Sequence, residues 1–323
     1  MSDAGLLEQL DELAAAGRYG DVRDRLRELP AAVVESRTRL ALLASEAEGR
    51  LGDLVAAARW ADVALARART RGERYAELRA RNFHGAIALA RGAVEEAERH
   101  FSDGVSLARL LGDHATEARC LNNLGILANI RGDPEAALGR YRLAIVAYQQ
   151  VGLARGVAET YHNMGISLRD QREFRRALEA AEEAVRLARA AGDERLAALV
   201  AVGRAELHLL LGDAAFAGAE LERAAATYGR IGFPAGLPEV WRVQAAVARA
   251  RGEMAEALRL LRQAAGAAEQ QASVDVLADI ERDRGSVLAQ AGDAAGARAA
   301  RERAGALYQR LGATAKAEAV VRE

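Results

Sequence analysis

The chain repeats itself every 40 residues, and this period limits its fold more than any other feature of the sequence. Counting back from Gly292, a turn of the Gly-Asp or Gly-Glu type, or an equivalent of it, recurs at Gly252, Gly212, Arg172, Gly132, Gly92 and Gly52. A second series has the same period, with Ala272 out of the pattern, and consists of Gly72, Gly112, Gly152, Gly192, Gly232 and Gly312. Such self-similarity predicts an array of one supersecondary unit stacked on its neighbours, not one globular core.

Small residues recur in columns inside each period. The first column is alanine in seven successive repeats: Ala57, Ala97, Ala137, Ala177, Ala217, Ala257 and Ala297. A column in the other helix of each unit consists of Gly85, Gly125, Gly165, Ala205, Ala245 and Gly285. Glycine inside a helix costs about 1 kcal/mol relative to alanine. Its recurrence therefore indicates sites where helix axes approach closely and a larger side chain would overpack.

These residues carry a family resemblance. The stretches 121–125 (LNNLG) and 161–165 (YHNMG), together with Ala97-x3-Phe101 and Ala137-x3-Tyr141, resemble the tetratricopeptide pattern W-x2-L-G-x2-Y…A-x3-F. The repeat period is 40 instead of ~34 residues, and the consensus proline is missing. In both features the chain resembles the long-repeat subgroup, such as kinesin light chain and the bacterial peptide-pheromone receptors. The resemblance implies protein or peptide binding on a concave surface.

We therefore predict an all-α protein, a right-handed α-solenoid (TPR superhelix) of about eight helix-turn-helix repeats plus a C-terminal capping helix. The low aromatic content, 4%, and only four prolines agree with helices packed through alanine and leucine. The predicted organisation is a short atypical N-terminal hairpin over 1–30, seven units over 31–312 and a capping helix over 313–323. Pro234 and Pro238 are expected to delay one helix and to kink the superhelix there.

Composition and termini narrow the class of protein. The net charge of −1 provides no general field for a polyanion, so we expect no nucleic-acid partner. The amino terminus does not resemble a signal peptide. No uninterrupted apolar stretch reaches the ~18 residues that span a bilayer. The expectation is a cytoplasmic protein with no membrane partner, and the arginine-rich composition favours a bacterial source. Cys120 is expected to be a buried, inert thiol.

The search for catalytic and metal-binding motifs gives no candidate. Phosphate-binding loops and zinc-protease motifs are absent from the sequence. The five histidines, which show no metal-ligand spacing with one another or with Cys120, are His84, His100, His114, His162 and His208. Adjacent carboxylates such as Glu95 and Glu96 diverge on a helix and face water. We predict no catalytic residue, no cofactor and no metal site.

Polar columns on the first helix of each unit indicate a ligand-binding groove. The resemblance implies that these first helices line the concave side. The candidate peptide-binding residues are Arg79, Asn82, Arg119, Asn122, Asn123, Asn129, His162, Asn163 and Arg169. Asparagine can pair with both peptide groups of a ligand backbone, and arginine binds carboxylates bidentately, so a peptide with acidic groups is expected. Alternatively, Asn123 and Asn163 satisfy backbone groups at a helix crossing.

Three classes of function remain open at this stage. The first is a non-catalytic protein- or peptide-binding scaffold or adaptor. The second is a ligand- or peptide-responsive sensor, part of a bacterial regulatory system, whose effector would be a separate chain or domain. The third, an enzyme, has no catalytic constellation to support it. The sequence leaves the partner's identity and the oligomeric state open.

Overall fold

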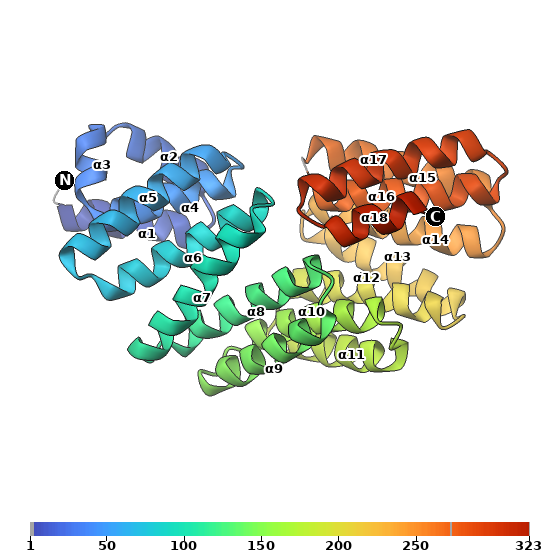
Figure 1. Ribbon diagram of the computed structural model, residues 1–323, viewed down its shortest axis with the longest axis horizontal. Coiled ribbons are helices and arrows are strands. Elements are labelled where there is room, and N and C mark those ends of the chain that lie inside the picture. Colours follow the sequence, from blue (N-terminus) through green and yellow to red (C-terminus); the bar gives the residue numbers. More distant parts are fainter. Residues whose placement is uncertain (1–2, 272, 323) are drawn as a thin grey trace. The chain divides into compact units, whose positions relative to one another are not determined.

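The computed structural model describes residues 3–271 and 273–322. The chain divides into two compact units, Met1–Leu124 (the N-terminal unit) and Gly125–Glu323 (the C-terminal unit), each described here by itself. Within the described residues the secondary structure is helical, with 18 α-helices, one short 3-10 helix and no strand, so the predicted all-α class is confirmed (Figure 1). None of these helices combines the length and apolarity that crossing a membrane requires.

The N-terminal unit is built from helical hairpins. Its helices are α1 (Asp3–Ala15), α2 (Tyr19–Arg27), α3 (Ala31–Ser36), α4 (Thr38–Arg50), α5 (Leu54–Arg71), α6 (Arg74–Ala90) and α7 (Val94–Leu111). The next helix, α8 (His114–Ile130), begins in this unit and ends in the C-terminal unit. The short helix α3, which follows Pro30 and precedes α4, was not expected from the 40-residue period.

The C-terminal unit continues the pairing of helices. Its helices are α9 (Pro134–Gln150), α10 (Ala154–Asp170), α11 (Phe174–Ala190), α12 (Glu194–Leu210), α13 (Ala214–Arg230), η1 (Pro234–Gly236), α14 (Leu237–Ala250), α15 (Met254–Gln270), α16 (Val274–Gln290), α17 (Ala294–Arg310) and α18 (Thr314–Arg322). The expected delay at the prolines is confirmed, since η1 occupies the first turn and α14 has 14 residues where α12 has 17.

The turns explain the glycine series. Each glycine of both series has a positive φ, for example 78° at Gly132 and 69° at Gly192. Side chains other than glycine rarely adopt this conformation. Arg172 takes the corresponding position with φ of 63°, and it is the one non-glycine residue of positive φ in the described chain. Ala272, the exception in the second series, lies outside the described residues.

The columns of small residues lie where helices of one pair touch. Ala137, Ala177, Ala217 and Ala257 are fully buried. A Cβ atom added to Gly85 would lie 2.5 Å from Cε1 of Phe101, on the other helix of its pair. These contacts confirm that the columns mark close helix packing, because the glycine makes room for an aromatic ring from the facing helix.

The first helices form an inner layer in the C-terminal unit. Here α10 contacts α12, α12 contacts α14, and α14 contacts α16, while each second helix packs mainly against the first helices on either side. First helices that touch one another directly must lie on the more tightly curved side of the stack. We call α10, α12, α14 and α16 the inner helices.

Candidate functional site

All the predicted binding residues lie on first helices, and they divide between the two units. Arg79 and Asn82 lie on α6, and Arg119, Asn122 and Asn123 lie on the part of α8 that belongs to the N-terminal unit. The members in the C-terminal unit are Asn129, His162, Asn163 and Arg169.

In the N-terminal unit, the predicted residues differ in how accessible they are to a ligand. Asn82 is buried and accepts a weak hydrogen bond from the Cys120 thiol, with 3.8 Å between Oδ1 and Sγ. Arg79 lies 3.8 Å from Glu46 and over the ring of Phe83. Arg119 is exposed and forms no ion pair within the described part of the chain. It is therefore the arginine of this group most open to a ligand.

Cys120 has the environment expected of an inert thiol. It is fully buried, and burial raises its pKa to about 12, so the reactive thiolate is not formed at neutral pH. The predicted burial of this residue is confirmed, and its partner Asn82 contributes to the packing of α6 against α8.

Asn129 links three helices of the C-terminal unit. Its Nδ2 donates to the Tyr141 hydroxyl on α9 at 3.1 Å, and its Oδ1 accepts from the Ser167 hydroxyl on α10 at 2.7 Å. Burial raises the pKa of Tyr141, which keeps its hydroxyl protonated. Both ends of the Asn129 amide are thus engaged in holding helices together.

His162 and Arg169 line one cavity on α10. The other residues around this cavity are Gly165, Ile166, Ala181, Val200, Gly203 and Leu207. A Cβ atom at Gly203 on α12 would lie 3.5 Å from Cε1 of His162, so glycine leaves room beside the ring. Burial, assisted by the charge of Arg169, lowers the pKa of His162 to about 4. At neutral pH the cavity therefore presents a neutral imidazole beside a charged guanidinium and apolar side chains.

A chain of ion pairs runs from this cavity along the inner helices. Arg169 on α10 binds Glu206 on α12, and Arg242 on α14 binds the same carboxylate at 3.2 Å. Arg242 also binds Asp283 on α16 at 2.8 Å. The chain continues through Arg282, which lies 2.9 Å from Asp283 and 3.0 Å from Asp279, to the Tyr308 hydroxyl on α17, which donates to Asp279 at 2.5 Å.

The charges in this chain are mutually stabilised. Burial alone would raise the pKa of Glu206, but Arg242 and Arg169 together lower it to about 2. Burial would likewise lower the pKa of Arg242, but Glu206, Glu239 and Asp283 outweigh this effect and raise it. Glu206 and the two arginines that bind it are thus ionised at neutral pH, and the guanidinium of Arg169 is already occupied by Glu206 and Asp170.

Sequence reasoning found some of these residues and missed others. Glu239, Arg242, Asp279 and Arg282 stand in the polar columns of the first helices. Glu206 was missed because the same position of the two preceding repeats holds Ile126 and Ile166, which gives its column no polar pattern. Only the distance to the two arginines identifies Glu206 as the centre of the chain.

The structure also brings together side chains that the sequence did not connect. His84, Glu96 and His100 of the N-terminal unit have ligand atoms within 4.8 Å of one another. No metal site was expected, because the histidines are 16 residues apart and match no ligand spacing. A sequence signal does exist for two of the three residues, since Glu96 and His100 are four residues apart on one helix.

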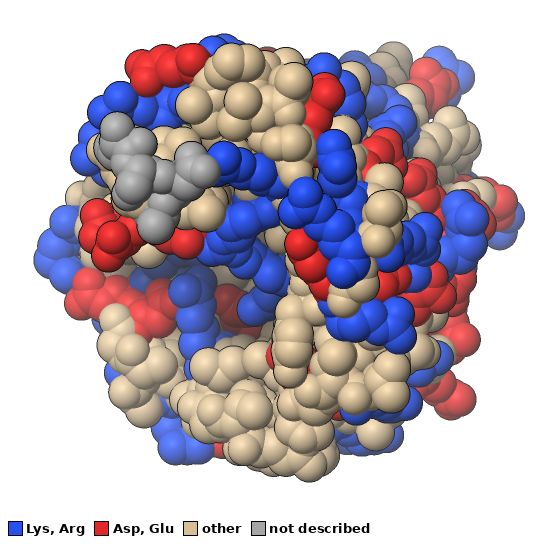
Figure 2. Space-filling view, turned by 90° about the vertical axis from the view of Figure 1, so that its left-hand side faces the viewer, with Lys and Arg blue, Asp and Glu red and all other residues tan. Residues whose placement is uncertain are grey.

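The surface charges are mixed. Figure 2 shows basic and acidic side chains intermixed over the face that it presents, in agreement with the net charge of −1. A ligand would therefore interact with individual charged side chains and not with a surface potential of one sign.

Comparison with known proteins places the chain among repeat proteins. Models of the tetratricopeptide repeat match residues 76–150 and 157–191. No curated protein matches the sequence.

Solved structures share the fold at low sequence identity. The apo form of RapI is 12% identical with a TM-score of 0.69, covering 84% of this chain and 98% of RapI. A Rap protein complexed with Competence and Sporulation Factor is 14% identical with a TM-score of 0.65, over 99% of this chain and 95% of that protein. NprR in complex with its cognate peptide NprX is 15% identical with a TM-score of 0.66, over 99% and 96%. The two matching models show that the chain contains tetratricopeptide repeats. The repeated helix pairs and the similar solved structures show an all-α solenoid fold.

Proposed function

We propose that the chain is a non-catalytic scaffold of the bacterial cytoplasm that binds a peptide or a peptide-like segment of a protein along its first helices. The observation that carries this proposal is the cavity on α10, where His162 and Arg169 stand beside apolar residues and adjoin the ion-pair chain of the inner helices. Polar groups beside apolar side chains suit peptide recognition, because the polar groups orient a ligand that lies across them. NprR, which was solved in complex with its cognate peptide NprX, supports the proposal by its similar fold.

The ligand is proposed to carry acidic groups. Arg119, which is exposed and forms no ion pair within the described residues, is the arginine best able to take up a carboxylate. The partly exposed side chains of Asn122 and Asn163 are proposed to pair with the ligand backbone. Arg169 is held by Glu206, so an acidic group there must compete with a carboxylate already in place. We therefore assign Arg169 to orienting a segment bound at the cavity of the C-terminal unit, and Arg119 to recognising an acidic group bound at the N-terminal unit.

A peptide library tests this proposal. Short random peptides are selected on the purified chain, and the affinities of the selected sequences are measured by fluorescence anisotropy. Acidic sequences are expected to be enriched among the selected peptides. The double variant Asn122→Ala/Asn163→Ala is expected to lower the affinity for these peptides. The control is Gln149→Ala/Gln150→Ala, which removes two exposed amides from the second helix α9. If both double variants bind the selected peptides as tightly as the wild type, the binding surface is not on the first helices.

A sensor is the second candidate, and the ion-pair chain favours it. Arg242 bridges α12 and α16 by binding Glu206 and Asp283 at once, so a ligand that draws Arg169 away from Glu206 changes the partners available to the next helices. NprR from B. thuringiensis, which has a similar fold, is described as a quorum sensor. Small-angle scattering with and without a selected peptide separates the two functions. A sensor changes its dimensions on binding, and a passive adaptor keeps them.

A further inference from the structure

We propose that His84, Glu96 and His100 form a binding site for a divalent transition-metal ion in the N-terminal unit. His84 lies on α6, and the other two lie on α7, the second helix of the same pair. Their ligand atoms, two imidazole nitrogens and a carboxylate oxygen, all lie within 4.8 Å of one another. The site uses none of the residues proposed to bind peptide, so either proposal can fail without the other.

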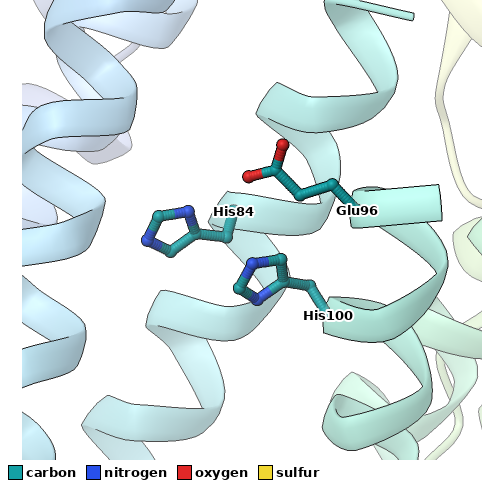
Figure 3. A group of neighbouring side chains, drawn as sticks. All are labelled: His84, Glu96 and His100. Carbon is teal, nitrogen blue, oxygen red and sulfur yellow. The ribbon is translucent and has the colours of Figure 1, made fainter. Parts of the chain in front are cut away.

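The repeat geometry makes these positions face each other. Figure 3 shows Glu96 and His100 reaching from one helix toward His84 on the neighbouring helix. The two imidazole rings are stacked, with centroids 4.6 Å apart and planes 9° apart. Three repeats later, the positions of His84 and His100 are taken by Arg204 and Glu220, which form an ion pair of 2.7 Å. These two positions therefore connect the helices of a pair elsewhere in the chain as well.

Packing leaves the two imidazoles incompletely satisfied. Nε2 of His84, which lies on the side of Asp62, and Nδ1 of His100 are buried and have no hydrogen-bond partner among the described residues. An unpaired buried polar atom is costly, and two apolar side chains would fill the same space without that cost. Packing alone therefore does not account for histidines at these two positions.

Imidazole binds a metal ion through a ring nitrogen that carries no proton. Arg81, which lies one turn before His84 on α6, is held by Glu77 at 3.0 Å and by Asp103, which reduces its effect on an ion bound here.

An acidic side chain beyond the three ligands supports one of the rings. Nε2 of His84 lies 3.3 Å from Oδ1 of Asp62 on α5, close enough to form a hydrogen bond after a small rotation. This leaves Nδ1 of His84 to face Glu96 and His100. Metal-binding histidines usually donate their other ring nitrogen to a carboxylate in this way, which orients the ring and raises its basicity.

The donor set selects the kind of metal. Two nitrogens and one oxygen suit Zn²⁺ and related late transition metals, whereas Mg²⁺ and Ca²⁺ prefer oxygen ligands. Zinc bonds of about 2.0–2.1 Å place ligand atoms about 3.3 Å apart, so the three side chains must close inward when the ion binds. Glu96 and His100 are only partly buried and can make this movement. A bound ion would tie α6 to α7.

Calorimetric titration of the EDTA-treated full chain with Zn²⁺ tests the site. One Zn²⁺ per chain is expected to bind and to raise the melting temperature, because an ion that binds only the folded state stabilises it by mass action. Mg²⁺ is expected to do neither. His100→Gln and Glu96→Gln should each weaken Zn²⁺ binding at least tenfold. The control His114→Gln changes a half-exposed histidine of the same unit that lies outside the group, and it should leave the affinity unchanged.

Two further measurements keep the result interpretable if a ligand variant is unstable. Asp62→Asn keeps all three ligands and removes an exposed carboxylate, and it should weaken binding by about 10–100-fold. Co²⁺ added to the wild type should produce visible absorption of a low-symmetry site, and this absorption should be lost in Glu96→Gln. The proposal is overturned if the folded wild type binds no Zn²⁺, or if it binds Zn²⁺ with an affinity that His100→Gln and Glu96→Gln leave unchanged.

Discussion

Arg242 on α14 forms an ion pair with Glu206 on α12, with 3.2 Å between Nη1 and Oε1, although only 3% of Arg242 is exposed. A buried arginine is tolerated only when its charge is compensated. Glu239 and Asp283 provide the rest of that compensation, at 2.7 Å and 2.8 Å. The inner helices are therefore joined by a charged chain whose members depend on one another, in addition to the alanine packing within each pair.

Replacing Glu206 should destabilise the C-terminal unit. Glu206→Gln removes the shared partner of Arg169 and Arg242, although both arginines keep other carboxylates. We expect a loss of about 1–3 kcal/mol in the free energy of unfolding, measured by urea denaturation. The control Glu256→Gln breaks an exposed pair with Arg259 and should leave the free energy of unfolding nearly unchanged. Equal losses in the two variants would mean that the buried chain contributes no more than a surface pair.

Stability should fall in two steps as the pH decreases. The pKa of His162 is about 4 in the folded chain against 6.5 for the free side chain, and that of Glu206 is about 2 against 4.5. Both are lowered on folding, so the unfolded chain binds protons first and the stability present at higher pH is lost as the pH falls. The first step covers about pH 6.5 to 4, and the second about pH 4.5 to 2.

Single variants assign these steps. Urea denaturation at a series of pH values should show a smaller first step in His162→Gln and a smaller second step in Glu206→Gln. Burial also lowers the pKa values of His84 and His100, so these residues contribute to the first step. Part of the first loss of stability should therefore remain in His162→Gln. A wild-type unfolding free energy that does not change between pH 7 and pH 4 would contradict the burial of these rings.

The fold could be predicted because the turns between its helices need a backbone conformation that favours glycine. A turn with positive φ needs glycine at nearly every occurrence, so the turns are visible in the sequence as two glycine series. The close contacts are visible for a similar reason, since Gly85 must leave room for the ring of Phe101. The helix α3 was not predicted, because it occurs once and has no counterpart in the other repeats.

The site could be predicted only in part. The period shows which residues share a helix face, but it does not show which residues of successive helices meet. Glu206 pairs with Arg242, 36 residues later, because of the offset between α12 and α14. His84 and His100 meet because of the crossing of α6 and α7, which no single column records. Such pairings depend on side-chain reach and helix crossing, and only the three-dimensional structure provides them.

Two glycines on neighbouring helices should respond oppositely to alanine. A Cβ atom at Gly125 on α8 would collide with the ring of Tyr141, whereas one at Gly139 on α9 would meet no atom within 4 Å among the described residues. Gly125→Ala is expected to destabilise the chain by about 1–3 kcal/mol through overpacking. Gly139→Ala should stabilise it by up to about 1 kcal/mol, because alanine favours a helix interior. Thermal denaturation of both variants decides the matter, and a stabilised Gly125→Ala would show that the ring moves aside freely.

Arg172 offers a stabilising substitution. Its φ of 63° is a conformation that costs a side-chain-bearing residue roughly 1 kcal/mol and costs glycine little. Arg172→Gly should therefore raise the free energy of unfolding by about 0.5–1 kcal/mol, as measured in urea. The reciprocal variant Gly192→Ala, with φ of 69° in a turn of the second glycine series, should lower it. No gain from Arg172→Gly would indicate that the arginine side chain makes a compensating contact.

Binding of an acidic peptide should depend on salt and on Arg119. Contacts between an exposed guanidinium and a carboxylate weaken as salt rises, because ions screen exposed charges over about 8–10 Å at physiological strength. The affinity of a selected acidic peptide should fall between low and physiological salt, and Arg119→Ala should lower it again and flatten the salt dependence. The control Arg142→Ala removes an exposed arginine of the second helix α9 and should change neither quantity. Salt-insensitive binding that survives Arg119→Ala would place the ligand elsewhere, and the cavity of about 310 Å³ beside Trp60 and Leu26 in the N-terminal unit would be the next surface to test.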